Sequence, residues 1–149
     1  MALWHSSNKG KTETLVELAA YLQWRYNPAI RVDIPYSPSA PIDPSKKDIR
    51  CKFQIGGLVV AIDSEGDPNT GLDVRLLELV TTHNADVIFC ASRTRGDTVD
   101  AVEKIHKNNG YELIWTSTYH LCAKGCTTTA NRVKAQHMVE LMQQLGHLP

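Results

Sequence analysis

The chain has no excess of charge of either sign. Its 149 residues contain 16 lysines and arginines and 16 aspartates and glutamates, which gives a formal net charge of zero with neutral histidines. A protein that binds nucleic acid without sequence preference usually carries a basic excess, and a solvated interaction tail is often acidic. The composition therefore gives no strong signal for nucleic-acid binding.

Cysteines and long apolar runs are also few. Four cysteines are too sparse for a disulfide scaffold in a chain of this length. No apolar run approaches membrane-spanning length, and the first residues, MALWHSSNKG, lack the charged region and apolar stretch of a signal peptide. We therefore expect no membrane partner, a cytoplasmic location, and one domain over residues 1–149 that is long enough to bury a core.

Strand and helix patterns alternate along most of the sequence. Short apolar or β-rich runs predict strands at residues 2–5, 30–34, 49–55, 58–62, 86–92 and 111–119. Helical spacing of apolar residues predicts helices over 13–26, 72–82, 97–109 and 127–145. This alternation is typical of a three-layer α/β fold, with a mostly parallel sheet and helices on both faces. The hairpin predicted around Gly56-Gly57 would place one antiparallel strand at an edge of that sheet.

Two segments of this pattern carry further expectations. PYSPSAPIDPSKKD, residues 35–48, has four prolines at three-residue spacing, which favours an extended, solvated loop. A loop of this length often acts as a lid or a binding segment. On the last predicted helix, the apolar face is expected to consist of Ala130, Val133, His137, Leu141 and Leu145.

The stretch SSNKGKT, Ser6 to Thr12, has the composition of a phosphate-binding loop. Such a loop needs small residues, so that backbone N–H groups can turn toward an anion, and a helix that begins there with its positive dipole end facing the phosphates. It also needs a lysine that reaches the terminal phosphates and a hydroxyl that ligates magnesium, which Lys11 and Thr12 supply after Gly10. Because Gly-Lys-Thr also occurs by chance, the motif alone leaves an ordinary turn as the alternative.

A second element follows at the position that such a loop leads one to expect. LVVAID, Leu58 to Asp63, is an apolar run that ends in an acidic residue, and DSEG, Asp63 to Gly66, matches Asp-x-x-Gly. In that pattern the glycine N–H meets the γ-phosphate, and the loop switches when the phosphate leaves. The plain alternative is a buried strand that ends in a polar turn. The two elements together favour a nucleotide site.

These two elements resemble those of the P-loop NTPases, with a divergent Walker A motif at residues 6–12 and a Walker B motif that ends at Asp63. The resemblance covers residues 2–26 and 58–67, and it implies a single P-loop nucleotide-binding domain that uses Mg²⁺ and ATP. Lys11 would neutralise β- and γ-phosphate oxygens, Thr12 would ligate magnesium, and Asp63 would orient it. The nucleotide-binding residues that it implies are Ser6, Ser7, Asn8, Lys9, Gly10, Lys11, Thr12, Glu13 and Gly66.

The sequence departs from the family pattern at two places. His5 stands where the first glycine of the loop is usual, so its side chain could narrow the loop and weaken or alter binding. After the VIFCAS strand the sequence reads SRTRGD, which does not match the Asn-Lys-x-Asp motif that recognises guanine. We therefore expect ATP rather than GTP as the ligand.

Four charged residues near these motifs are further catalytic candidates. Glu65 and Asp67 flank Gly66 and could position an attacking water or accept a hydroxyl proton, although solvated loop carboxylates are the alternative. Arg93 and Arg95 follow the next predicted strand, so they are expected at the carboxyl edge of the sheet. There a guanidinium could stabilise a transferring phosphoryl group or bind an acceptor's phosphate, and exposed surface arginines are the alternative.

Three functions follow from these motifs. The first is a hydrolase of the nucleotide phosphoanhydride bond, or a protein that switches on that nucleotide. The second is a small-molecule or nucleotide kinase of the same fold, in which the two arginines and the proline-rich loop hold the acceptor. The third is a non-catalytic module with a degenerate loop that binds a protein partner. A chain of 149 residues leaves little room for the insertion and lid that kinases often carry, which favours the first.

Overall fold

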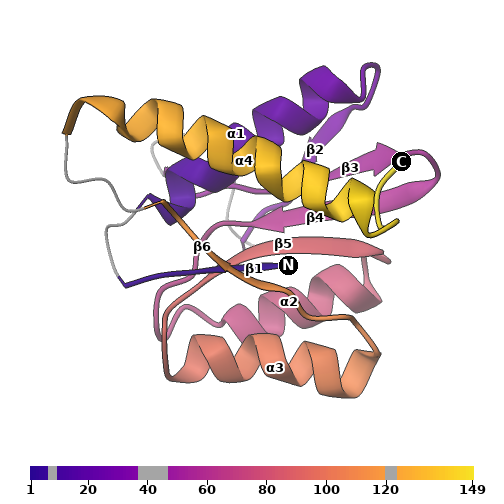
Figure 1. Cartoon of the computed structure of the whole chain (residues 1–149). Helices are drawn as coiled ribbons and strands as arrows, with labels where there is room; N and C mark the ends of the chain where they lie inside the picture. Colours follow the sequence, from indigo (N-terminus) through magenta and orange to yellow (C-terminus); the bar gives the residue numbers. More distant parts are fainter. Residues whose placement is uncertain (7–9, 37–46, 120–123) are drawn as a thin grey trace.

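The computed structural model describes residues 1–6, 10–36, 47–119 and 124–149 (Figure 1). Within these residues a six-stranded mixed sheet has the strand order β2-β3-β4-β5-β1-β6. The strands are β1 Ala2–Trp4, β2 Arg31–Asp33, β3 Arg50–Ile55, β4 Leu58–Asp63, β5 Val87–Ser92 and β6 Trp115–Ser117. The helices are α1 Lys11–Arg25, α2 Leu72–Thr81, α3 Asp97–Asn109 and α4 Thr127–Gln144, with a 3₁₀ turn at Lys124–Cys126.

The helices cover both faces of the sheet, with α1 and α4 on one face and α2 and α3 on the other (Figure 1). Successive side chains of a strand point to opposite faces, and β4 follows this rule. Val60 and Ile62 pack in the core beneath α1 and α4, whereas Ala61 packs in the core beneath α2 and α3. The predicted alternating α/β architecture with helices on both faces is therefore confirmed.

The antiparallel part of the sheet differs from the prediction in its position. β4, β5, β1 and β6 run parallel to one another, and β3 pairs antiparallel with β4 as the predicted hairpin. However, β2 pairs with the outer side of β3, so β2 forms the edge of the sheet. The burial of the strands explains this order, because most side chains of β3 are buried, whereas the three residues of β2 are exposed or half-exposed.

The buried face of α4 also differs from the prediction. The helix buries Ala135, Met138, Val139 and Met142, which are spaced i, i+3, i+4 and i+7. His137, Leu141 and Leu145 of the predicted face are exposed instead. Two stripes with helical spacing lie on this helix, and the stripe with alanine and methionine packs against α1 and the sheet.

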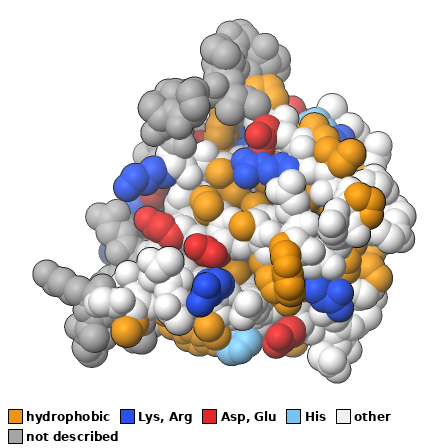
Figure 2. Space-filling view, turned by 90° about the horizontal axis from the view of Figure 1, so that it is seen from above, with side chains coloured by type: hydrophobic (Ala, Val, Ile, Leu, Met, Phe, Trp, Pro, Cys, Tyr) orange, Lys and Arg blue, Asp and Glu red, His pale blue; other side chains and the backbone are white. Residues whose placement is uncertain are grey.

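The surface of the molecule carries charges of both signs, as the balanced composition leads one to expect. Seen from the side of α1 and α4, acidic and basic side chains are interspersed among apolar ones (Figure 2).

Of the helices in the described part of the chain, none combines the length and the apolar character needed to cross a membrane.

Candidate functional site

A cleft of about 830 Å³ lies beside the start of α1. Residues from four segments line it: the first two turns of α1, Lys47 and Asp48 before β3, the loop after β4, and the start of α4. The loop after β4 and the start of α1 follow the carboxyl ends of parallel strands, and ligands of α/β sheets bind at this edge. The cleft is thus in the place where the sequence predicts a site.

The start of α1 is defined by the backbone of Gly10 and by the contacts of Lys11. Gly10 precedes the helix with φ 76° and ψ 16°, a left-handed conformation that glycine adopts without steric cost. The Lys11 amine donates hydrogen bonds to the carbonyl oxygens of His5, at 3.0 Å, and Ser6, at 2.9 Å. Two carbonyls that follow β1 therefore hold the amine of Lys11. Ser7, Asn8 and Lys9 lie outside the described residues.

Lys11 is a largely buried cation. The residue is only 8% exposed, and within the described residues no carboxylate lies within ion-pair distance of its amine. Burial lowers the pKa of Lys11, and the nearby Arg93 guanidinium lowers it further, while Asp67 and Glu13 act in the opposite direction. Two carbonyl dipoles and more distant carboxylates only partly offset the charge. An anion in the cleft would therefore stabilise the charged amine of Lys11.

Thr12 contacts a carboxylate, which comes from Asp48. The Thr12 hydroxyl donates to Asp48 Oδ1 at 2.9 Å, and the Ser64 hydroxyl donates to the same oxygen at 3.0 Å. Ser64 Oγ in turn accepts a hydrogen bond of 2.7 Å from the backbone N–H of Ile49. All three side chains, from Thr12, Asp48 and Ser64, line the cleft. Two hydroxyls and a carboxylate thus converge at the cleft, beside the first turn of α1.

Asp63 lies on the other face of the sheet from Thr12. It alternates with Ile62 and therefore shares the side of Ala61, beneath α2. Its side chain is fully buried, and its Oδ2 is 2.9 Å from Arg75 Nε and 3.4 Å from Arg50 Nε. Burial raises the pKa of Asp63, and the two arginines oppose that rise. The structure does not bring Asp63 and Thr12 together at the cleft.

Arg75 also fixes the loop that follows β4. Its guanidinium donates to the carbonyl oxygens of Glu65 and Thr70, and it pairs with the Glu65 carboxylate at 3.2 Å. Gly66 in the same loop lies directly on β5, since a Cβ atom at this residue would come within 2.5 Å of the carbonyl carbon of Ala91. Glu65 is therefore engaged with α2, while Gly66 and Asp67 border the cleft.

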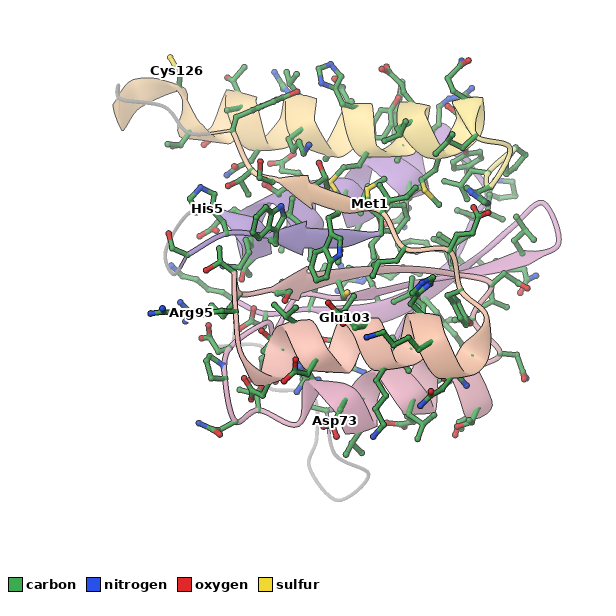
Figure 3. All side chains as sticks on the ribbon, turned by 60° about the horizontal axis from the view of Figure 1, so that its bottom comes forward. Met1, His5, Asp73, Arg95, Glu103 and Cys126 are labelled. Atoms are coloured by element: carbon green, nitrogen blue, oxygen red, sulfur yellow. The ribbon has the colours of Figure 1, made fainter. Side chains whose placement is uncertain are left out.

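Among the residues that the structure describes, Arg93 contacts the site and Arg95 does not. Arg93 Nη2 lies 2.5 Å from Asp67 Oδ1, which links the end of β5 to the loop after β4. Its backbone N–H donates to the Thr98 hydroxyl at 3.0 Å. Arg95 is exposed and extends outward at the same end of the molecule as His5 (Figure 3).

Several residues of the site were missed by the sequence reasoning. Asp48 and Ser64 carry no motif, and Asn131 reaches the site from α4, where its Oδ1 accepts a hydrogen bond of 3.2 Å from Thr14. The Asn131 side chain also lies over Gly10, as a Cβ there would be 2.8 Å from its Oδ1. The one available signal for Asp48 was its position at the end of the proline-rich segment, which was expected to act as a binding loop.

The described residues do not form a metal site from acidic, histidine or cysteine side chains alone, since no three of them are grouped in a way that could hold an ion. No protein-family model matches the chain, and the comparisons with curated proteins and with solved structures gave no match either. The function is therefore inferred from the geometry of the cleft.

Proposed function

We propose that this chain is a P-loop protein that binds a nucleoside triphosphate, ATP with magnesium, in the cleft beside α1, and that it hydrolyses the nucleotide or switches on it. The observation that carries the proposal is Lys11, whose amine is held by backbone carbonyls at the edge of an open cleft and has no contacting carboxylate in the part of the chain that the structure describes. A cation in this setting is stabilised by an anionic ligand.

The start of α1 supplies the rest of a phosphate site. The helix has 15 residues, and the positive end of its dipole lies beside Lys11 in the cleft. The terminal phosphates would therefore lie between the helix start and the Lys11 amine. Arg93 would add a second cation from the end of β5, because its electrostatic effect already reaches Lys11.

The oxygen donors in the cleft fit magnesium. This ion keeps several waters and takes one or two protein ligands together with phosphate oxygens, so it does not need a cage of acidic side chains. The Thr12 hydroxyl would be one ligand. When bound, magnesium would neutralise phosphate charge and hold the phosphate oxygens in place.

Asp67 is the favoured candidate for orienting the attacking water. It borders the cleft and its side chain is 66% exposed, whereas the Glu65 carboxylate is paired with Arg75. Asp67 pairs with Arg93, so its carboxylate lies beside the guanidinium that would bind the transferring phosphoryl group and would orient the water once a phosphate has taken its place on Arg93.

A kinase of small molecules or nucleotides is the second candidate. The exposed Arg95, at the same end of the molecule as His5, favours it, because a free guanidinium there could bind the phosphate of an acceptor (Figure 3). Formation of ADP from ATP only when a metabolite is added, with transfer of the γ-phosphoryl group seen as a gain of mass by that metabolite, would establish the kinase. Release of phosphate without an acceptor supports the hydrolase.

Isothermal titration with ATP, GTP, ADP and dATP, with and without Mg²⁺, tests the proposal. We expect Lys11→Ala to weaken ATP binding on the order of 10- to 100-fold, because it removes a charge-assisted contact with the phosphates. Lys107→Ala is the matched control, since Lys107 is an exposed lysine of α3 that pairs with Glu103. A wild-type chain that binds none of these nucleotides would refute the proposal and leave the non-catalytic interaction module.

A further inference from the structure

We propose that Asp48, and not Asp63, is the carboxylate that holds the magnesium ion beside Thr12. This inference rests on the proposed function and names the residue that completes its metal site. The observation that carries it is the convergence of the Thr12 and Ser64 hydroxyls on one oxygen of Asp48, at 2.9 Å and 3.0 Å, inside the cleft.

The pairing of β3 with β4 places Asp48 there. In the antiparallel register Arg50 lies opposite Asp63, so the residues before Arg50 run beside the residues after Asp63. The backbone confirms this continuation, because the N–H of Ser64 donates to the carbonyl of Ile49 at 2.9 Å. Ser64 therefore leaves the sheet on the α1 side, next to Asp48, one residue after Asp63 has turned to the α2 side.

The chemistry of Asp48 suits a ligand of magnesium. A carboxylate is among the oxygen donors that this ion prefers, and it can bind directly or through a water. Oδ1 is fixed by two hydroxyl donors, and among the residues that the structure describes no donor reaches Oδ2. The Thr12 hydroxyl can bind a cation through its oxygen while its O–H still donates to Asp48, because a hydroxyl has lone pairs besides its single donor.

The surroundings of Asp63 exclude it from the same role. Both of its oxygens lie near guanidinium nitrogens, with Oδ2 2.9 Å from Arg75 and Oδ1 3.3 Å from Arg75. Moving this carboxylate to a metal would take from Arg50 and Arg75 the fully buried carboxylate that they share, which is strongly unfavourable. Asp63 is therefore a structural residue that anchors α2 to the end of β4.

Titration of Mn²⁺, followed by electron paramagnetic resonance of the free ion, tests this assignment on the intact chain at saturating ATP. We expect Asp48→Asn to weaken Mn²⁺ binding by about tenfold or more. ATP affinity without metal should stay the same or rise, because the substitution removes a negative charge near the phosphates. Glu17→Gln is the matched control, since Glu17 is another carboxylate that lines the cleft, and it should leave Mn²⁺ binding unchanged.

Asp63→Asn should lower the melting temperature and leave Mn²⁺ affinity per folded molecule unchanged. If that variant does not fold, the comparison of Asp48→Asn with Glu17→Gln still decides the question. Wild-type Mn²⁺ affinity in Asp48→Asn would overturn the role of Asp48 alone, whereas failure of the wild-type chain to bind ATP would overturn the proposed function together with it.

Discussion

Replacing Gly66 with alanine tests whether this glycine is needed for the packing of the loop after β4 or only for nucleotide binding. In the Asp-x-x-Gly pattern the glycine serves the γ-phosphate, so its replacement should harm only nucleotide binding. The structure gives a different reason. A Cβ atom on Gly66 would lie 2.5 Å from the carbonyl carbon of Ala91 and 2.6 Å from its oxygen. These are backbone atoms of β5, a central strand of the sheet, so they cannot move aside.

The loop after β4 has to lift from β5 to admit the methyl group. Overpacking of this kind costs about 1–3 kcal/mol. In a domain of this size that corresponds to a fall in melting temperature of about 2–12 °C. Because the clash is present without any ligand, we expect the fall in the nucleotide-free protein.

Thermal and urea unfolding of the nucleotide-free variant measure this effect. Gly125→Ala is the matched control, because a Cβ at Gly125 meets nothing within 4 Å and its φ is not positive. We expect the control to unfold within about 0.5 kcal/mol of the wild type. A Gly66→Ala protein as stable as this control would show that the loop does not lie on β5 as described, and the placement of Asp67 beside the cleft would fall with it.

Two further predictions concern the start of α1 and the core. Gly10→Ala should destabilise the chain by about 1–2 kcal/mol in urea unfolding, since alanine is strained at φ 76°. A Cβ atom at Gly10 would also lie 2.8 Å from the Asn131 side-chain oxygen, so adding Asn131→Ala should remove only the part of the destabilisation that comes from this clash. A double variant with wild-type stability would contradict the left-handed conformation of Gly10. In alkylation at pH 8 read by peptide mass spectrometry, Cys126 should react, because it is exposed. Cys51 and Cys90 should react only after unfolding, since burial raises the pKa of both thiols to about 12 and keeps them protonated; rapid labelling of either in the folded protein would place it outside the core.

The local parts of the site could be predicted from the sequence, because they depend on neighbouring residues. The apolar run before Ser6, the small residues after it and the helical spacing from Glu13 onward indicate a strand, a loop and a helix. The structure has β1, the left-handed Gly10 and α1 at these places. Lys11 and Thr12 consequently border a cleft at the start of the helix, as expected.

The sequence could not predict toward which face of the sheet Asp63 points, because the residues before it do not alternate between polar and apolar. Residues 58–62 are all apolar, as is usual for a strand that is buried on both faces, so the pattern does not show which side chains point toward α1. The role of Asp48 could not be predicted for a related reason. It lies 36 residues from Thr12, and only the register of β3 with β4 brings the two together.

In the proposed function the loop after β4 responds to a ligand at the start of α1, and the strand order indicates which residue would link the two. β5 lies between β1 and β4, so the end of β4 does not adjoin the strand that leads to Lys11. Arg93, at the end of β5, bridges this distance through its pair with Asp67.

The contacts that hold the loop after β4 differ in their burial. Arg75 holds it through a guanidinium that is 5% exposed, and the Asp97 carboxylate accepts a hydrogen bond from the backbone of Asn69 at the far end of the loop. The pair of Arg93 with Asp67 is more open, with side chains that are 23% and 66% exposed. A phosphate beside Lys11 can therefore compete with Asp67 for Arg93 without exposing a buried charge, whereas displacing Arg75 would break the ion pair of Asp63. In the proposed function, the ion pair of Arg93 with Asp67 is thus the first contact of this loop that a bound triphosphate would break.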